Sequence, residues 1–134
     1  MDETTARPEW ATLPALDGAD PRALAEAVAF VLDEKKGHEI KTLHVEDKTV
    51  LADYFVLCTG YSNTQVNALA DEVDFKIGQR GLSPLHYEGR DNGSWVLIDY
   101  GSVIVHIFSR EARDFYNLDK LWSDAVPVDL GEQN

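Results

Sequence analysis

The sequence predicts an α/β (α+β) fold, with a single mixed β-sheet of about five strands flanked by helices. Segments 20–36 and 62–81 carry apolar residues at helical spacing, whereas residues 95–108 form two short apolar runs around a glycine. The predicted elements follow in the order α-β-β-α-β-β-β-α, which favours a mixed sheet with helices packed against it. At 134 residues the chain has the length of one such domain.

The first predicted helix runs from about residue 20 to residue 36. Asp20 is a favourable N-cap, Pro21 suits the first turn, and Gly37 is expected to end the helix. The apolar stripe that should face the core consists of Leu24, Val28, Val31 and Leu32.

Two strands are expected next, at 40–45 and 52–58, followed by a second helix. Ser62 and Gln65 form a capping-box pattern, in which each side chain satisfies a backbone N–H near the helix start. Apolar residues then recur every three or four positions, so this helix should end near Gly81.

Residues 95–108 predict a β-hairpin, which a short strand at 84–88 should precede. A two-residue turn at Gly101 and Ser102, with glycine first, matches a type II′ turn and sets the register. The register pairs Tyr100 with Val103, Ile98 with Val105, Val96 with Ile107, Asp99 with Ile104, Leu97 with His106 and Trp95 with Phe108. One face is then wholly apolar. The other is partly polar, so it is either covered by helices of the protein or offered to a partner.

A last helix is expected from Ser109, which can cap it, to Trp122. In one continuous helix, two stripes would form: Phe115, Leu118 and Trp122 on the first, and Tyr116 and Lys120 on the second. We expect Phe115 to be a core residue.

The composition points to a protein partner. The chain has 24 Asp and Glu against 12 Lys and Arg, a net charge of −12, which repels phosphate and disfavours direct nucleic-acid contact. Such a surface suits a basic protein. Cys58 is the single cysteine, which excludes an internal disulfide and fits a reducing compartment. No apolar run has the length of a membrane span and residues 1–19 lack the features of a secretory signal, so we expect a cytoplasmic protein.

Three parts are expected along the chain. Residues 1–19 should be a flexible acidic N-terminal arm, in which Trp10 either packs or is a chance exposed aromatic. The domain should span residues 20–124, and residues 125–134 should form a short C-terminal tail.

Three constellations could carry chemistry, and each has a simpler structural interpretation. The turn 59–62 could hold an anion, but a strand-to-helix turn is favoured because no phosphate-binding signature follows. Asp99 and His106 lie diagonally across the hairpin and could form an acid–base pair, but a hydrogen bond to a half-buried imidazole is commoner. The histidines show no zinc-ligand spacing with Cys58, so neither a metal site nor a cofactor is predicted.

The C-terminal part of the chain is rich in aromatic residues: Trp95, Tyr100, Phe108, Tyr116 and Trp122. Several should be core residues, yet five exceed what a small core needs, and Trp and Tyr are favoured interface anchors. Nearby acids could form a rim that attracts a basic partner, or simply a solvated face: Asp99, Asp114 and Asp119.

Five segments occur in a specific order: DYFVLCTG (53–60), EG (88–89), WVLIDYG (95–101), VIVH (103–106) and YNLDKLW (116–122). None is diagnostic alone, but together they resemble the ribosomal silencing factors, the Iojap-like family. The resemblance covers roughly residues 20–124. It implies a nucleotidyltransferase-like topology without that chemistry, because those enzymes hold magnesium with clustered carboxylates, whereas Gly101 stands two positions after Asp99.

The resemblance also implies a function. Ribosomal silencing factors bind the large ribosomal subunit through a basic protein, ribosomal protein fourteen of that subunit. They thereby block association with the small subunit and repress translation under nutrient limitation. The expected protein is therefore a regulator rather than an enzyme. The alternatives are a metal-dependent nucleotidyltransferase-like enzyme and a homodimeric adaptor, and a homodimer is also possible for a silencing factor when it is free.

The expected partner-binding residues come from the hairpin and the last helix: Trp95, Asp99, Tyr100, Gly101, Ser102, Val103, Tyr116 and Lys120. Secondary candidates come from the family's motifs: Thr59, Gly60, Gln65 and Glu88.

Overall fold

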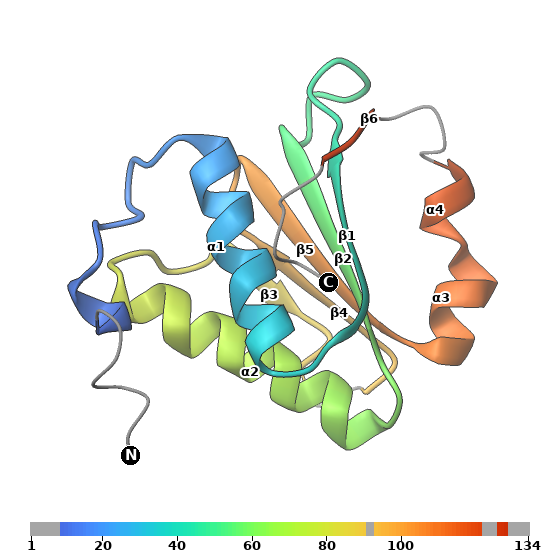
Figure 1. Cartoon of the computed structure of the whole chain (residues 1–134). Coiled ribbons are helices and arrows are strands. Elements are labelled where there is room, and N and C mark those ends of the chain that lie inside the picture. The colour runs from blue at the N-terminus through green and yellow to red at the C-terminus, as the bar shows by residue number, and fades with distance from the viewer. Residues whose placement is uncertain (1–8, 91–92, 122–125, 129–134) are drawn as a thin grey trace.

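The computed structural model describes residues 9–90, 93–121 and 126–128 (Figure 1). The helices are η2 (Trp10–Thr12), α1 (Pro21–Glu34), α2 (Asn63–Gln79), α3 (Arg110–Tyr116) and α4 (Leu118–Leu121). The strands are β1 (His38–His44), β2 (Tyr54–Gly60), β3 (His86–Glu88), β4 (Trp95–Asp99), β5 (Val103–Ser109) and β6 (Val126–Pro127).

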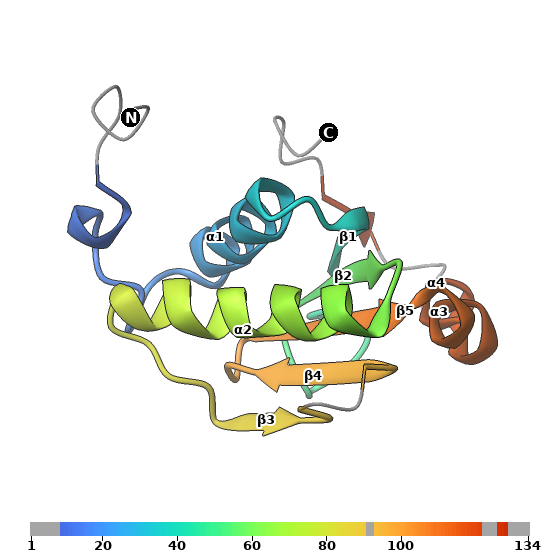
Figure 2. The ribbon, with the colours of Figure 1, turned by 90° about the horizontal axis from the view of Figure 1, so that it is seen from below.

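The strands form one mixed sheet in the order β3-β4-β5-β2-β1-β6. The central pair, β2 and β5, is parallel, and the other pairs are antiparallel. Helices α1 and α2 cover one face, while α3 and α4 lie on the other side (Figures 1 and 2). The predicted mixed sheet flanked by helices is confirmed; the sixth strand is the two-residue β6, which pairs with the end of β1.

The central strands are apolar because both of their faces are buried. Alternate residues of β5 point to opposite faces. Val105 and Ile107 belong to the core under α1 and α2, whereas Ile104 and Phe108 belong to a second core with Ala112 of α3. Each fully buried apolar side chain contributes roughly 1.5–3 kcal/mol. The two cores hold the sheet between the helix pair and the C-terminal segment.

The first helix forms where its N-terminal signals predict. The side chain of Asp20 accepts a hydrogen bond from the Arg22 N–H at 3.2 Å, and Pro21 occupies the first turn. The predicted role of Gly37 as the stop residue is wrong, because the helix ends at Glu34 and Lys36 takes the left-handed conformation, with φ of 68°. All members of the predicted stripe are buried: Leu24, Val28, Val31 and Leu32.

Gly37 is required for another reason. A methyl group at this position would overlap the Sγ atom of Cys58 on the neighbouring strand. Glycine therefore allows the chain leaving α1 to approach β2 closely. The thiol of Cys58 is buried, and burial raises its pKa to about 12.

The hairpin register is confirmed at every predicted pair from Trp95 with Phe108 to Asp99 with Ile104. The Tyr100 N–H donates to the Val103 carbonyl at 2.9 Å, which closes the two-residue turn. Gly101 has φ of 91°, the positive value that the first position of a type II′ turn requires.

The predicted continuous helix from Ser109 to Trp122 is wrong within the described residues. Ser109 caps the helix as predicted, but α3 ends at Tyr116. Asn117 then takes the left-handed conformation, with φ and ψ both 52°, and α4 starts at the next residue. Tyr116 and Lys120 therefore do not lie four apart on one helix, and Trp122 lies outside the described residues.

Phe115 shows the consequence of this break. It was expected in the core, but its exposed fraction is 80%. With the chain turning at Asn117, the stripe that would have buried Phe115 does not continue, and the ring points away from the core.

The described part of the predicted N-terminal arm packs against the domain. Leu16 is buried, and its N–H donates to the Arg80 carbonyl at 2.7 Å. Trp10 donates its indole N–H to the Lys76 carbonyl at 2.7 Å. Residues 9–19 thus contact α2, in contrast to the flexible arm expected from the sequence, while residues 1–8 lie outside the described residues. The boundaries at 20 and 124 stay predictions.

Candidate functional site

Five aromatic rings cluster where β4, β5 and α3 meet, and we call them the aromatic corner: Trp95, His106, Phe108, Phe115 and Tyr116. Trp95 lies at the centre. Its ring centroid is 4.5 Å from that of Tyr116 and 5.1 Å from that of Phe108. Phe115 meets Tyr116 edge to face at 5.0 Å.

The exposure of the rings increases from one side of the aromatic corner to the other. Phe108 and His106 are buried, Trp95 is partly buried, and the exposed fractions of Tyr116 and Phe115 are 49% and 80%. A rigid set of rings with an exposed edge is typical of interface anchors, because burying it on a partner costs little side-chain entropy.

The buried side of the corner is held by a hydrogen bond. Trp95 donates its indole N–H to Nδ1 of His106 at 3.1 Å, and His106 also meets Phe55 edge to face. Burial lowers the pKa of His106 to about 4, so the imidazole is neutral at physiological pH and can accept this bond. The described contacts do not pair Asp99 with His106: Nδ1 of His106 accepts the Trp95 indole N–H, and the Asp99 carboxylate accepts the Gly101 N–H at 2.7 Å.

The α3 backbone is anchored by a buried arginine that the sequence patterns do not predict. Arg113 donates to both carboxylate oxygens of Asp119, at 2.9 and 3.0 Å. Its Nη1 donates to the Thr59 hydroxyl and to the Glu39 carbonyl, both at 2.9 Å. The only hint in the sequence is Asn117, a residue that tolerates the left-handed conformation and so permits Asp119 to fold back.

The other predicted contact residues of the hairpin lie at the opposite end of β4 and β5 from Trp95. Tyr100 and Val103 are buried in the core under α1 and α2. Asp99, Gly101 and Ser102 are partly exposed around the turn. The structure therefore does not bring these turn residues together with the aromatic corner. Lys120 is exposed on α4.

The secondary candidates mostly serve the fold. Thr59 and Gly60 are buried, and a methyl group at Gly60 would overlap Val66 of α2. Gln65 accepts the Tyr61 N–H at 2.6 Å and donates to the Lys36 carbonyl at 3.2 Å, so it ties the start of α2 to the end of α1. These contacts are those of a strand-to-helix turn.

Glu88, the last of the secondary candidates, differs from the others because no described contact gives its side chain a role in the fold. It is exposed on β3 and pairs with Leu97 across the sheet.

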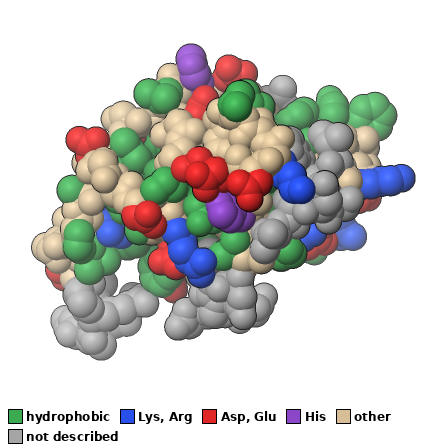
Figure 3. All heavy atoms as spheres, turned by 90° about the horizontal axis from the view of Figure 1, so that it is seen from above, with side chains coloured by type: hydrophobic (Ala, Val, Ile, Leu, Met, Phe, Trp, Pro, Cys, Tyr) green, Lys and Arg blue, Asp and Glu red, His purple; other side chains and the backbone are tan. Residues whose placement is uncertain are grey.

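The acidic residues near the aromatic corner differ in whether their carboxylates are bound within the domain or exposed to a partner. Asp119 is held by Arg113 and by Lys41 at 3.2 Å, and its hydrogen bonds from Arg113 lower the pKa of its carboxyl to about 2. Asp114, which immediately precedes Phe115 in the sequence, is exposed. Acidic side chains are not confined to this corner. Figure 3 shows a group of Asp and Glu side chains in the middle of the face seen from above.

Metal ligation has no support among residues 9–90, 93–121 and 126–128, where no group of three or more His, Cys, Asp or Glu side chains could hold an ion. In the same residues, no helix is long and apolar enough to cross a membrane.

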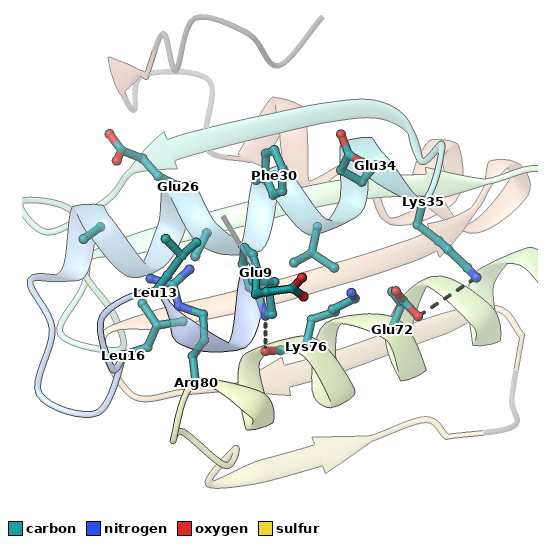
Figure 4. Close-up of a pocket in the computed structure, with 14 residues that line it drawn as sticks. Glu9, Leu13, Leu16, Glu26, Phe30, Glu34, Lys35, Glu72, Lys76 and Arg80 are labelled. Carbon is teal, nitrogen blue, oxygen red and sulfur yellow. Dashed lines mark hydrogen bonds and ion pairs between the residues drawn. The ribbon is translucent and has the colours of Figure 1, made fainter. Parts of the chain in front are cut away.

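A separate groove of about 760 Å³ lies between η2, α1 and α2 (Figure 4). Trp10 stacks on Phe30 there, with ring centroids 5.8 Å apart. Charged side chains of both signs also line it, and two of them, Lys35 and Glu72, pair with each other at 4.0 Å. A lining with both charges favours neither an anionic nor a cationic ligand. The aromatic corner therefore remains the candidate site.

Comparison with known proteins decides the family. Residues 18–134 match the family model described as "Ribosomal silencing factor during starvation". The chain belongs to this family. The ribosomal silencing factor RsfS of Bacillus subtilis is 38% identical over 109 residues, which are 81% of this chain and 92% of that protein. The silencing factor of Haemophilus influenzae is 38% identical over 101 residues, 75% of this chain and 99% of that protein.

The chain is also similar to a plant protein and to a solved structure. The chloroplastic protein Iojap of Zea mays is 32% identical over 119 residues, 89% of this chain and 52% of that protein. A crystal structure of a Chromobacterium violaceum protein has a TM-score of 0.77 and 31% identity, and covers 86% of this chain and 98% of that chain. The resemblance to the silencing factors is thereby confirmed.

Proposed function

We propose that the protein silences ribosomes by binding the large ribosomal subunit through its basic ribosomal protein fourteen. Bound there, it blocks association with the small subunit and represses translation under nutrient limitation, in the cytoplasm. Family membership supports ribosome silencing. The observation that carries the contact surface is the exposed aromatic corner on an acidic domain.

The contact surface that we propose differs from the one expected from the sequence. Trp95 and Tyr116 remain as anchors, and Phe115 joins them because it is 80% exposed on the same corner. Tyr100 and Val103 are buried and cannot reach a partner without unfolding the hairpin. The remaining hairpin residues, Asp99, Gly101 and Ser102, with Lys120, form the periphery in this proposal.

Charge favours a protein partner over RNA within the large subunit. A net charge of −12 repels the phosphate backbone and attracts a basic protein surface. Apolar rings then supply the free energy of desolvation, while the acidic surroundings speed the encounter. Blocking a subunit interface needs tight binding and no reacting group.

The enzyme alternative requires clustered carboxylates at a strand end. Asp99 instead binds the backbone of its own turn, and the described residues contain no metal-binding group of side chains. We therefore propose a regulator without catalysis.

Sedimentation tests the proposal. The purified protein is mixed with isolated large subunits, isolated small subunits or intact ribosomes, and each mixture is centrifuged through a sucrose cushion. We expect cosedimentation with large subunits only and fewer reassembled ribosomes when the protein is added before mixing the subunits. Absence from the large-subunit pellet would contradict the proposal.

A matched pair of variants tests the contact surface. Phe115→Ala removes an exposed ring of the aromatic corner, and Phe75→Ala removes a ring of 60% exposure on α2, on the other side of the sheet. Only Phe115→Ala should weaken large-subunit binding, by about 1–2 kcal/mol. Equal effects of the two variants on binding would contradict the proposal that the contact surface includes α3.

A homodimer through the same corner is the remaining alternative for the free protein. Light scattering at low micromolar concentration measures its mass. A dimer that Phe115→Ala dissociates would show that copies of the chain compete with the ribosome for this surface, whereas a monomer leaves the corner open for the ribosome.

A further inference from the structure

Arg113 is the most deeply buried cation among the described residues, with an exposed fraction of 8%. Its guanidinium reaches three separate parts of the chain. It binds Asp119 of α4 with two parallel hydrogen bonds, the Thr59 hydroxyl of β2, and the Glu39 carbonyl of β1. Only an arginine has a planar fork that can serve three such directions at once.

The same residue stands one helical turn before the exposed side of the aromatic corner. Arg113 and Tyr116 are three apart in α3, a spacing that places them on neighbouring parts of one helix face. The Tyr116 ring in turn rests on Trp95 of β4, 4.5 Å between centroids. α3 spans only Arg110–Tyr116, which is too short to be stable as an isolated helix, so its contacts with the rest of the domain must hold it.

The break at Asn117 is also tied to this arginine. Because the backbone turns there, α4 folds back and brings the Asp119 carboxylate to Arg113, where Lys41 of β1 adds a second cation at 3.2 Å. The turn, the ion pair and the position of α3 against the sheet are thus one arrangement with Arg113 at its centre.

We propose that Arg113 is the positioning residue of the partner-binding surface: its bonds to Asp119, Thr59 and Glu39 hold α3 so that Tyr116 stays packed on Trp95. This inference rests on the proposed function, in which the aromatic corner binds the large subunit. Arg113 is buried and does not itself touch the partner. It acts through Tyr116.

A double-mutant cycle tests this indirect action. Large-subunit affinity is measured for the parent protein, Arg113→Met, Tyr116→Ala and the combined variant. We expect Arg113→Met to weaken binding roughly tenfold, about 1.4 kcal/mol, in the parent but less than about twofold in the Tyr116→Ala background. A loss of equal size in both backgrounds would overturn the proposal, because it would mean that Arg113 acts independently of Tyr116.

Two further variants distinguish the positioning role of Arg113 from a general loss of stability. Arg22→Met breaks an exposed ion pair with Glu26 on α1 and should leave affinity unchanged. Asp119→Asn keeps the arginine but weakens its bidentate partner. It should reproduce the Arg113→Met effect on affinity even if Arg113→Met itself does not fold. Full affinity of a folded Asp119→Asn protein would contradict the proposal.

A measurement without ribosomes separates this inference from the proposed function. Nuclear Overhauser contacts between the Tyr116 ring and the Trp95 indole should be strong in the parent and weak in Arg113→Met, with contacts inside the core under α1 and α2 retained. Failure of the parent to bind large subunits refutes the proposed function alone. Retained ring contacts in Arg113→Met refute the positioning role alone.

Discussion

The indole N–H of Trp95 donates to Nδ1 of His106 across the β4–β5 pair, 3.1 Å from donor to acceptor. The bond connects a partly exposed ring to a buried one. It holds the Trp95 ring at the orientation in which Tyr116 packs on it, so the exposed corner is continuous with the core of the sheet.

The burial of His106 predicts a pH dependence of stability. Burial lowers the pKa of His106 to about 4 from its ordinary value of 6.5, so between these values the unfolded chain binds more protons than the folded one. The free energy of unfolding should therefore fall as the pH drops from 6.5 towards 4, by roughly 2–3 kcal/mol from this residue.

The comparison variant for this prediction is His106→Asn, whose side-chain oxygen can still accept the Trp95 N–H but does not titrate. Urea unfolding at pH 7 and pH 4.5 should show a smaller loss for the variant than for the parent. Equal losses in the two proteins would mean that His106 titrates normally in the folded state.

Replacing Trp95 tests the central anchor of the aromatic corner. Trp95→Ala should weaken binding to large subunits by about 2 kcal/mol or more, since it removes a ring that packs on Tyr116 and Phe108. Trp95→Phe should lose less, because it keeps an aromatic ring and removes the N–H. Unchanged binding of a folded Trp95→Ala protein would exclude Trp95 from the surface.

Salt should act on association more than on dissociation. The net charge of −12 attracts a basic partner over a distance, and added salt screens exposed charges beyond about 10 Å at 0.1 M. Stopped-flow kinetics with large subunits should therefore show an association rate that falls with salt and a nearly constant dissociation rate. Association rates independent of salt would contradict electrostatic steering.

The contact between Gly37 and Cys58 predicts a specific rescue. Gly37→Ala should lower the free energy of unfolding by about 1–3 kcal/mol, because the added methyl overlaps the Cys58 sulfur. Combining it with Cys58→Ala should restore part of the loss. Thermal and urea denaturation of the three variants measure the effect, and a fully additive double mutant would show that the overlap with the sulfur is not the cause.

Much of the fold was predictable because its signals are local. The hairpin register follows from the positive φ that Gly101 supplies, and this turn geometry sets every pair from Trp95 to Phe108. The start of α1 follows from Asp20 and Pro21 in the same way. Such features depend on residues within a few positions of one another.

The candidate site was less predictable. The sequence identifies its aromatic residues, but it predicts Phe115 in the core and Tyr100 and Val103 at the surface, whereas Phe115 is exposed and the other two are buried. The sequence does not predict the role of Arg113, because Asn117 indicates only a turn after it and no nearby residue indicates that a cation is buried.

The sequence by itself therefore determined the local elements, the acidic character and, through its motifs, the family. Only the tertiary structure decided where the chain breaks at Asn117 and which rings face outward. Arg113 binds residues 54 and 74 positions earlier, and contacts over such separations override the helical spacing that predicted one continuous C-terminal helix. Spacing describes neighbours along the chain, whereas a buried charge is placed by partners that folding brings to it.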